Sequence, residues 1–154
     1  MGSLFGRLSS CQKLGLDTSV FIYHFEANPV YLSLTTEILK GIEVGHWKGI
    51  TSVITLMEIN VRPLRLGQPE IARMYEAILV HFPNLKIINL DRDVVRKAAF
   101  IRANYHLHTA DALQAAACIL HGCDTFITND RLLNRLQAEL NVVLLDDLRQ
   151  DQSQ

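Results

Sequence analysis

The sequence predicts an α/β domain with a central, mainly parallel sheet of about five strands that is flanked by helices. Short apolar runs of strand length recur along the chain, and longer segments with apolar residues at helical spacing lie between them. Strands that alternate with helices favour a parallel sheet, because each helix carries the chain back to the start of the next strand. The length of 154 residues fits one domain.

The first half of the chain supplies two strands and three helices. An apolar run at 14–17 predicts the first strand, and the helix expected over 20–27 stops near the proline that follows. An apolar stripe predicts a helix over 30–44, which ends at a glycine. The second strand is expected over 48–53. The next helix covers 54–62 and is broken or kinked by the proline after it.

The second half continues the alternation. Residues 68–82 are amphipathic and end at a proline, and the strand over 85–90 follows. The helix expected over 91–105 carries acids in its first turn and basic residues later, as the helix dipole favours. The helix over 109–121 is apolar almost all round, which is typical of a buried helix. The last elements are a strand, a helix and a strand over 125–128, 131–140 and 142–145.

We expect a folded domain over residues 13–148 between two tails. Residues 1–12 are predicted to be a flexible N-terminal tail, and residues 149–154 a polar C-terminal tail. The start of the chain lacks the long apolar stretch of a secretion signal, and no apolar run reaches the roughly 18 residues of a membrane helix. The three cysteines are odd in number and show no CxxC spacing, which favours a reducing, cytoplasmic setting without a membrane partner.

Four acids stand at the junctions between strands and helices: Asp17, Glu58, Asp111 and Asp130. The carboxyl ends of parallel strands share one edge of a sheet, and ligands bind at that edge. Acids far apart in sequence therefore converge in the predicted fold. Because clustered carboxylates repel one another, a hard divalent cation such as Mg²⁺ or Mn²⁺ is the expected guest.

Each acid also has an ordinary structural interpretation. Asp17 and Asp130 each precede a helix and would cap it. Glu58 fits a capping box with Thr55, and Asp111 would complement a helix dipole. The coincidence of all four acids at one predicted edge makes the cluster the better interpretation.

Four segments resemble the motifs of the PIN-domain nucleases, and most closely those of the VapC-type toxin ribonucleases of type II toxin–antitoxin systems. They are Leu16-Asp-Thr-Ser-Val-Phe-Ile22, Glu58, Thr109-Ala-Asp-Ala-Leu-Gln-Ala-Ala116 and Phe126-Ile-Thr-Asn-Asp130. The resemblance extends from about residue 14 to residue 147. It implies a PIN-like domain in which the acids bind one or two Mg²⁺ or Mn²⁺ ions and cut RNA.

Carried over by position, the metal-binding and catalytic residues implied by the resemblance are Asp17, Glu58, Asp111 and Asp130. The polar residues expected beside them, in contact with phosphate or with water around the metal, are Thr18, Ser19, Thr128 and Asn129. A metal at such a site lowers the pKa of a bound water and stabilises charge on the attacked phosphate. Arg131 and Arg62 are candidates for substrate phosphate contacts, although exposed helical faces commonly carry such residues.

The resemblance implies a metal-dependent endoribonuclease, the toxin of a toxin–antitoxin pair. Two alternatives stay open: a PIN nuclease that processes RNA without being a toxin, and a PIN-fold binding module that no longer cuts. The implied partners are an RNA substrate and an antitoxin protein that inserts a segment into the groove. A homodimer could also form through the apolar stripes at 30–44 and 68–82, although such stripes usually face the core.

The charge balance neither demands nor excludes a polyanionic partner. The chain carries 15 basic and 16 acidic residues, for a net charge of −1. Without the four acids that a metal would neutralise, 15 basic residues face 12 acidic ones.

Overall fold

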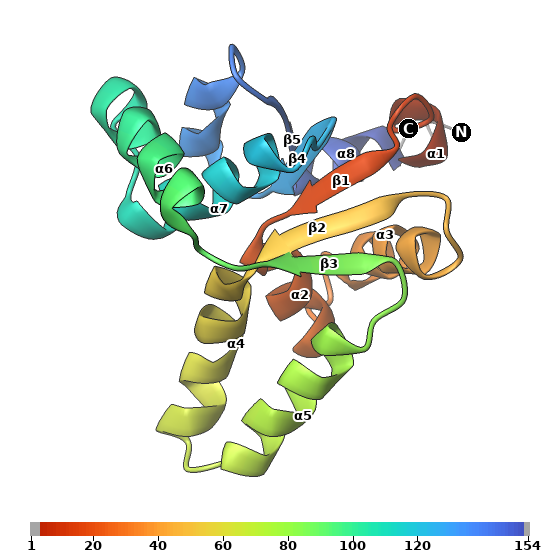
Figure 1. Cartoon of the computed structure of the whole chain (residues 1–154). Helices are drawn as coiled ribbons and strands as arrows, with labels where there is room; N and C mark the ends of the chain where they lie inside the picture. The colour runs from red at the N-terminus through yellow and green to blue at the C-terminus, as the bar shows by residue number, and fades with distance from the viewer. Residues whose placement is uncertain (1–3, 153–154) are drawn as a thin grey trace.

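Five short strands form an all-parallel sheet at the centre of the molecule in the computed structural model, which describes residues 4–152 (Figure 1). The strands are β1 (Lys13–Leu16), β2 (Lys48–Ser52), β3 (Leu85–Ile88), β4 (Thr125–Thr128) and β5 (Asn141–Leu144). The helices are α1 (Leu4–Arg7), α2 (Thr18–Phe25), α3 (Leu32–Glu43), α4 (Val53–Arg65), α5 (Pro69–Val80), α6 (Arg92–Tyr105), α7 (Thr109–Leu120), the 3₁₀ helix η1 (Arg131–Leu136) and α8 (Leu145–Gln152). The predicted fold class is confirmed.

The strand order is β3-β2-β1-β4-β5. From β1 the chain first adds strands on one side of the sheet and then on the other, so the order reverses beside β1. A crevice forms at the carboxyl ends of the strands where the order of an open parallel sheet reverses. The residue that follows β1 therefore lies at the position where this class of fold binds its ligands.

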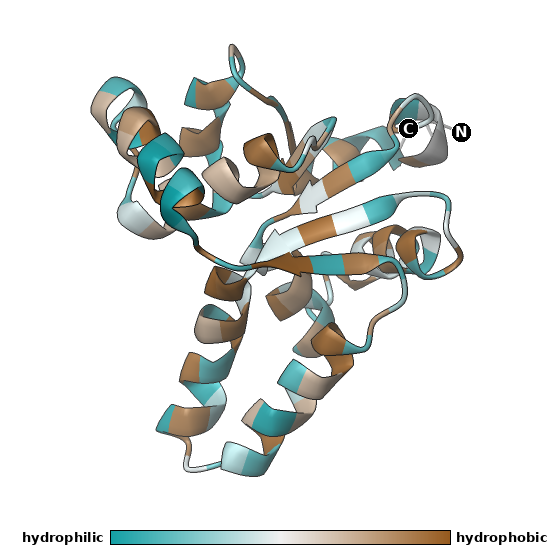
Figure 2. Ribbon diagram, in the orientation of Figure 1, coloured by the Kyte–Doolittle hydropathy of each residue, from teal (hydrophilic) through white to brown (hydrophobic). Residues whose placement is uncertain are grey.

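Helices cover both faces of the sheet and enclose two apolar cores. Figure 1 shows α6 and α7 on one face and α2 and α3 on the other, while α4 and α5 form a hairpin that extends away from the sheet. Successive residues of β4 point to opposite faces: Phe126 packs in the core under α6 and α7, and Ile127 in the core with α2 and α3. Apolar residues follow the strands and the inner sides of the helices (Figure 2).

The close approach of α7 to the sheet depends on a glycine in β1. A Cβ atom at Gly15 would lie 2.8 Å from the Sγ of Cys118 on α7 and 3.2 Å from the Sγ of Cys123. Cys118 and the alanines beside it on α7 are fully buried. The small residues on both elements thus let α7 lie directly on the centre of the sheet.

The structure differs from the expectation of a flexible tail at residues 1–12. Residues 4–7 form α1, and the side chains of Leu4 and Leu8 are only 2% and 1% exposed. The indole Nε1 of Trp47 donates a hydrogen bond to the carbonyl oxygen of Leu8 at 3.3 Å. The segment is ordered because two leucines one helical turn apart complete the core. Residues 1–3 of the predicted tail lie outside the described residues.

The expected polar C-terminal tail is helical over most of its length, because α8 continues to Gln152. Arg7 contacts Asp151 at 2.5 Å, and the amide of Gln152 donates to Glu37 at 2.8 Å. Residues 153–154 lie outside the described part.

Two other elements depart from expectation. The helix α4 passes through Pro63 and ends at Arg65, and the expected helix over 131–140 is the 3₁₀ helix η1, which ends at Leu136.

Candidate active site at the carboxyl edge of the sheet

The structure brings the four predicted acids to the carboxyl edge of the sheet. Asp17 follows β1 and caps α2, and Asp130 lies two residues after β4 and caps η1. Glu58 lies on α4 beyond β2, and Asp111 lies in the first turn of α7. Their charges interact: those of Asp111 and Glu58 raise the pKa of Asp17, and those of Asp130 and Glu58 raise the pKa of Asp111.

Asp17 is the most deeply placed of these acids, with a side chain that is 9% exposed. One oxygen, Oδ1, accepts the backbone N–H of Thr18 at 2.9 Å, and Oδ2 accepts the hydroxyl of Thr128 at 2.6 Å. Burial raises the pKa of Asp17 to about 6, because the loss of solvation outweighs these two hydrogen bonds and the nearby carboxylates add to it. A nearby positive charge would therefore stabilise the ionised form of Asp17.

Glu58 is held by a chain of buried hydroxyl groups. The hydroxyl of Thr18 donates to Oε1 of Glu58 at 2.7 Å and lies 3.2 Å from the hydroxyl of Thr55. Thr55 in turn lies 2.7 Å from the hydroxyl of Thr51 and accepts from Nε2 of Gln114 at 2.8 Å. The capping-box interpretation of Glu58 is wrong, because Ser52 caps α4 and Glu58 bonds instead to Thr18 at the start of α2.

Gln114 is the centre of this buried network. It is 1% exposed, and its Oε1 accepts a short hydrogen bond from the hydroxyl of Ser52. The hydroxyl of Thr51 donates to the carbonyl oxygen of Leu16 at 2.9 Å, which extends the network to the end of β1. Because buried polar groups are costly without partners, this network fixes the relative positions of β1, β2, α4 and α7 beneath the acids.

Asp111 and Asp130 complete the acidic edge from the other half of the chain. Both side chains are half-buried. Burial is the main cause that raises the pKa of Asp111, whereas His108 lowers it. Asp130 accepts the backbone N–H of Leu132 at 2.9 Å, and its own N–H donates to the hydroxyl of Thr128 at 3.1 Å. Thr128 thus bonds to two of the acids and holds them in a fixed relation.

The side chains of Ser19 and Asn129 differ in their hydrogen bonding. The hydroxyl oxygen of Ser19 is buried and has no hydrogen-bond partner among the described residues. The side chain of Asn129 is already engaged: its amide nitrogen donates to the hydroxyls of Tyr31 at 3.1 Å and Tyr23 at 3.4 Å.

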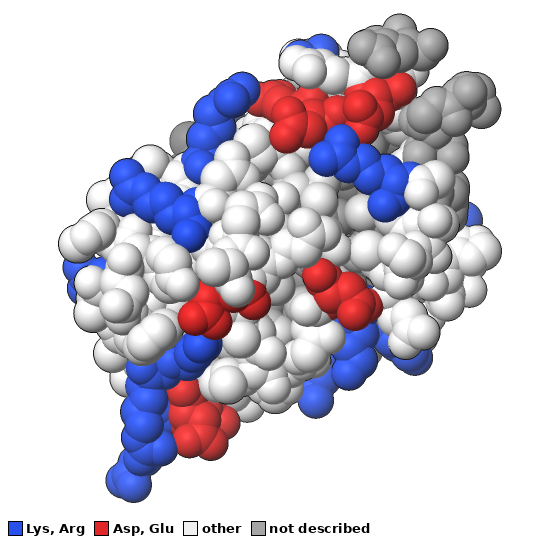
Figure 3. Space-filling model, turned by 90° about the horizontal axis from the view of Figure 1, so that it is seen from above, with Lys and Arg blue, Asp and Glu red and all other residues white. Residues whose placement is uncertain are grey.

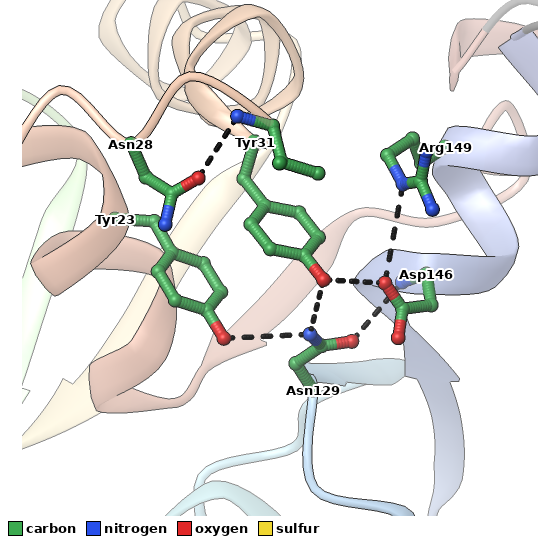
Figure 4. A network of polar contacts seen from close by, with 7 residues as sticks. Tyr23, Asn28, Tyr31, Asn129, Asp146 and Arg149 are labelled. Atoms are coloured by element: carbon green, nitrogen blue, oxygen red, sulfur yellow. Dashed lines mark hydrogen bonds and ion pairs between the residues drawn. The ribbon is translucent and has the colours of Figure 1, made fainter.

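Figure 4 shows how Asn129 connects the loop after β4 to α8. Its Oδ1 accepts the backbone N–H of Asp146 at 3.1 Å, and the hydroxyl of Tyr31 donates to Oδ1 of Asp146 at 2.5 Å. The rings of Tyr23 and Tyr31 stack with centroids 4.4 Å apart. Asn129 therefore orients the loop that carries Asp130.

The two predicted substrate-binding arginines also have different surroundings. Arg62 pairs with Glu26 at 2.9 Å and, together with Glu58, lines a cavity of about 410 Å³ between α2, α4 and α5. Arg131 is exposed and forms no ion pair within the described residues, which leaves its guanidinium available to an anion.

The acids fit a divalent cation by residue type and by mutual repulsion, since carboxylate oxygens are the ligands that Mg²⁺ and Mn²⁺ prefer. Within residues 4–152, however, no three His, Cys, Asp or Glu side chains are arranged as a group that could hold a metal ion. Asp17, Glu58 and Asp130 each accept a hydrogen bond from a protein donor at this edge.

Several residues of the site were absent from the prediction: Thr51, Ser52, Thr55, Gln114, Tyr31 and Asp146. Gln114 carried a signal, because it lies one turn after Asp111 on a helix that is otherwise apolar. No local sequence pattern pointed to Tyr31 and Asp146, because these two residues are 115 positions apart in the chain.

The protein is thus an α/β protein with a five-stranded parallel sheet whose strand order reverses beside β1. Its carboxylate site lies at the carboxyl edge of that sheet. The chain belongs to the PIN domain family, whose model matches residues 15–139. Proteins of this family are generally metal-dependent nucleases. The predicted family is confirmed.

Solved structures share the fold over most of the chain. A toxin–antitoxin complex from Klebsiella pneumoniae contains a chain 24% identical with a TM-score of 0.62, and the match covers 87% of this chain and 98% of that one. VapBC2 from Rickettsia felis bound to a DNA fragment from its promoter gives 17% identity, a TM-score of 0.65, and coverage of 86% and 98%. FitAcB from Neisseria gonorrhoeae has a sequence identity of 22% and a TM-score of 0.60, and the match covers 85% of this chain and 96% of that one. No curated protein sequence matches the chain.

No helix within residues 4–152 combines the length and the apolar character needed to cross a membrane.

Proposed function

We propose that this protein is a metal-dependent endoribonuclease that hydrolyses phosphodiester bonds in RNA. The observation that supports the proposal best is the meeting of four acids from four separate segments at the carboxyl edge, with Asp17 buried among the charges of Asp111 and Glu58. Helix capping alone does not account for the site, because burying a carboxylate beside two others is energetically costly.

Asp17 and Asp111 would hold the more tightly bound Mg²⁺ or Mn²⁺, and Glu58 and Asp130 would hold a second ion or orient the attacking water. When bound, the cation supplies a Lewis acid that makes water a better nucleophile and stabilises charge on the phosphate. Thr18 holds the carboxylate of Glu58 in place, and Thr128 does the same for Asp17. Ser19 would contribute its hydroxyl to a phosphate oxygen or to water around the metal, which requires this buried oxygen to become accessible.

The RNA backbone would meet Arg131 next to the acids. Arg62 is a weaker candidate, because an RNA phosphate must compete with its pairing to Glu26. Lysines and arginines are interspersed with acids on the face seen in Figure 3, so local contacts matter more than a general positive field.

The setting we propose is that of a cytoplasmic toxin with a cognate antitoxin. The support is the shared fold with structures of VapBC, FitAcB and a toxin–antitoxin complex. The cavity between α2, α4 and α5 lies beside Glu58 and has both apolar and charged lining residues, so an inserted antitoxin segment would fit there. A homodimer stays a prediction, for which the exposed Met74 and Ile78 on α5 offer a surface.

Two other functions compete with this proposal. A PIN nuclease that processes RNA would keep the same acids without an antitoxin, and a silent binding module would keep the fold without cutting. All four acids are present and electrostatically linked, which favours a nuclease over a silent module.

Cleavage of RNA by matched aspartate variants tests the nuclease. Asp17→Asn and Asp111→Asn should each lower the cleavage rate of a labelled RNA roughly 10³-fold or more in Mg²⁺ or Mn²⁺. The control is Asp93→Asn, which removes an exposed acid on α6 that pairs with Arg96. Its rate should match that of the unmodified protein, and EDTA should abolish cleavage in both. Full activity in Asp17→Asn would rule out the assignment.

The toxin role has its own test. Expression of the unmodified protein should arrest growth of a bacterial host, expression of Asp17→Asn should not, and the product of a neighbouring antitoxin-like reading frame should relieve the arrest. Active nuclease without growth arrest would favour the RNA-processing alternative.

A further inference from the structure

A second cavity lies at the opposite, amino edge of the sheet and is rich in lysine. It measures about 410 Å³ and is lined by Lys13, Lys48 and Lys86 together with Asn84 and His121, among other residues. These three are among the five lysines of the chain. None of its lining residues is an aspartate or a glutamate. We call this cavity the lysine pocket.

The three lysines lie on the same face of three neighbouring strands. Lys13 of β1 is the direct register partner of Lys48 of β2, and Lys86 of β3 is paired with Ile50. Lys48 and Ile50 are two residues apart, so they share a face, and Ile50 packs in the core under α7. The helix α7 ends at Leu120 and its C-cap residue His121 lines the pocket, so α7 stops short of covering the lysines.

The protein does not neutralise these charges. Lys13, Lys48 and Lys86 form no ion pair among the described residues, and the ammonium of Lys48 donates only to the neutral amide of Asn84 at 3.3 Å. Asp124, in the loop before β4, uses Oδ2 to accept the backbone N–H groups of Gln12 and Lys13. Like charges directly opposite each other on neighbouring strands are destabilising, so the pocket carries a cost that an anion would relieve.

We propose that the lysine pocket binds phosphate groups of the RNA strand, as a second anchor remote from the acids; this inference rests on the proposed function. Neighbouring strands are about 4.8 Å apart, so the three lysine backbones span about 10 Å across the sheet. A strand that carries several phosphates meets all three ammonium groups without forcing them together. Lysine contacts of this kind carry no sequence information and give salt-dependent affinity.

The anchor would act on binding and leave the chemistry unchanged. Lys13 begins β1 and Asp17 follows its end, so four residue steps along the strand separate them by about 13 Å. Lys13 and its register partner Lys48 therefore lie a strand length away from the acids. Loss of the pocket should raise KM for a long RNA and leave kcat as it is.

Salt-dependent binding of RNA provides the test. In an Asp17→Asn background that prevents cleavage, fluorescence anisotropy measures the affinity for a labelled single-stranded RNA over a series of KCl concentrations. Lys48→Gln/Lys86→Gln should lower the slope of log affinity against log salt by about 1.4, at about 0.7 per phosphate contact on a single strand. The matched control, Lys40→Gln/Arg73→Gln, removes two exposed charges on α3 and α5 and should keep the original slope.

Equal slopes for the two double variants would overturn the proposal. It would also fail if Lys48→Gln/Lys86→Gln lost binding of inorganic pyrophosphate in calorimetry but kept the RNA slope, because the pocket would then serve a small anion. A lowered slope in a protein that cuts no RNA would support the pocket and refute the nuclease, so the two failures can be told apart.

Discussion

The two edges of the sheet differ in both charge and bonding. At the carboxyl edge, Asp17 is buried, both of its oxygens accept hydrogen bonds, and other acids surround it. At the amino edge, Lys13 and Lys48 are exposed, lie opposite each other and have no acidic partner in the described chain. Asp17, Glu58 and Asp130 accept hydrogen bonds from the protein, whereas Lys13 and Lys48 have no ion pair with an acid among the described residues.

The direction of the chain explains why acids and bases separate in this way. Helices α2 and α4 begin where β1 and β2 end, so the positive ends of their dipoles point at the acidic edge. The helix α7 likewise begins at the acidic edge, with Asp111 in its first turn, and it ends at Leu120 beside the lysine pocket, where its negative end favours cations. The helix dipoles thus favour acids at one edge and bases at the other, although the charges within each cluster still repel one another.

The largest effect on folding is expected at Gln114. Substitution of Gln114 by Leu leaves the hydroxyl of Ser52 without its acceptor and that of Thr55 without a donor, in a site closed to water. We expect the free energy of unfolding to fall by about 4 kcal/mol in urea titrations. The control, Gln12→Leu, alters an exposed side chain and should change it by less than about 0.5 kcal/mol. Similar values for the two variants would show that the network is not needed for stability.

The next effect is a dependence of stability on pH at Asp17. Its pKa is about 6 in the folded protein and 3.8 ordinarily, so the folded state binds the proton more tightly. The folded state is then favoured at low pH, and stability falls as pH rises from about 4 to 6, by roughly 3 kcal/mol in total. In metal-free buffer, Asp17→Asn should therefore gain stability relative to the unmodified protein as pH rises through this window.

Asp93→Asn is the control for that measurement, because its carboxylate is exposed on α6. Its stability should run parallel to that of the unmodified protein at every pH in thermal unfolding. A constant difference between Asp17→Asn and the unmodified protein from pH 4 to pH 8 would contradict the raised pKa.

A smaller effect is expected under the lysine edge, where apolar packing supplies the stability. Leu8 is buried and its carbonyl oxygen accepts the indole N–H of Trp47, which directly precedes β2. Leu8→Ala should lower the free energy of unfolding by about 2 kcal/mol, at the low end for such a change because a chain end can collapse into the space. Ser9→Ala, at the exposed next residue, should have little effect. An unchanged stability in Leu8→Ala would restore the expectation of a flexible tail.

The sequence predicted the acidic edge well and the lysine edge poorly, for a physical reason. Asp17 and Asp130 follow strands, and the carboxyl ends of all parallel strands meet, so fold class alone places them together. Lys13, Lys48 and Lys86 each look like an ordinary solvated residue at the start of a strand. Their meeting depends on which strands are neighbours and on the register between them, and neither is visible from local patterns.

The helices missed at the two ends of the chain have a related cause. α1 is four residues long and α8 is strongly polar, so neither shows the periodicity that identifies a helix. Their stability comes from contacts with each other and with distant parts of the chain, such as the pairing of Arg7 with Asp151. The hydrogen bonds of Gln114 were hidden for the same reason, because its partners Ser52 and Thr55 lie on another segment.

The smallest effect distinguishes the two edges most directly. Replacing Lys48 by Gln removes repulsion with Lys13 and costs only an exposed bond to Asn84, so stability should rise by about 0.3 kcal/mol at low salt. The gain should vanish at high salt, where exposed charges are screened. Lys40→Gln breaks a pair with Glu43 and should lose a little stability under the same conditions. If Lys48→Gln lowered stability at low salt, the lysines would stabilise the fold. Repulsion between them would then give no reason to expect that an anion binds in the lysine pocket.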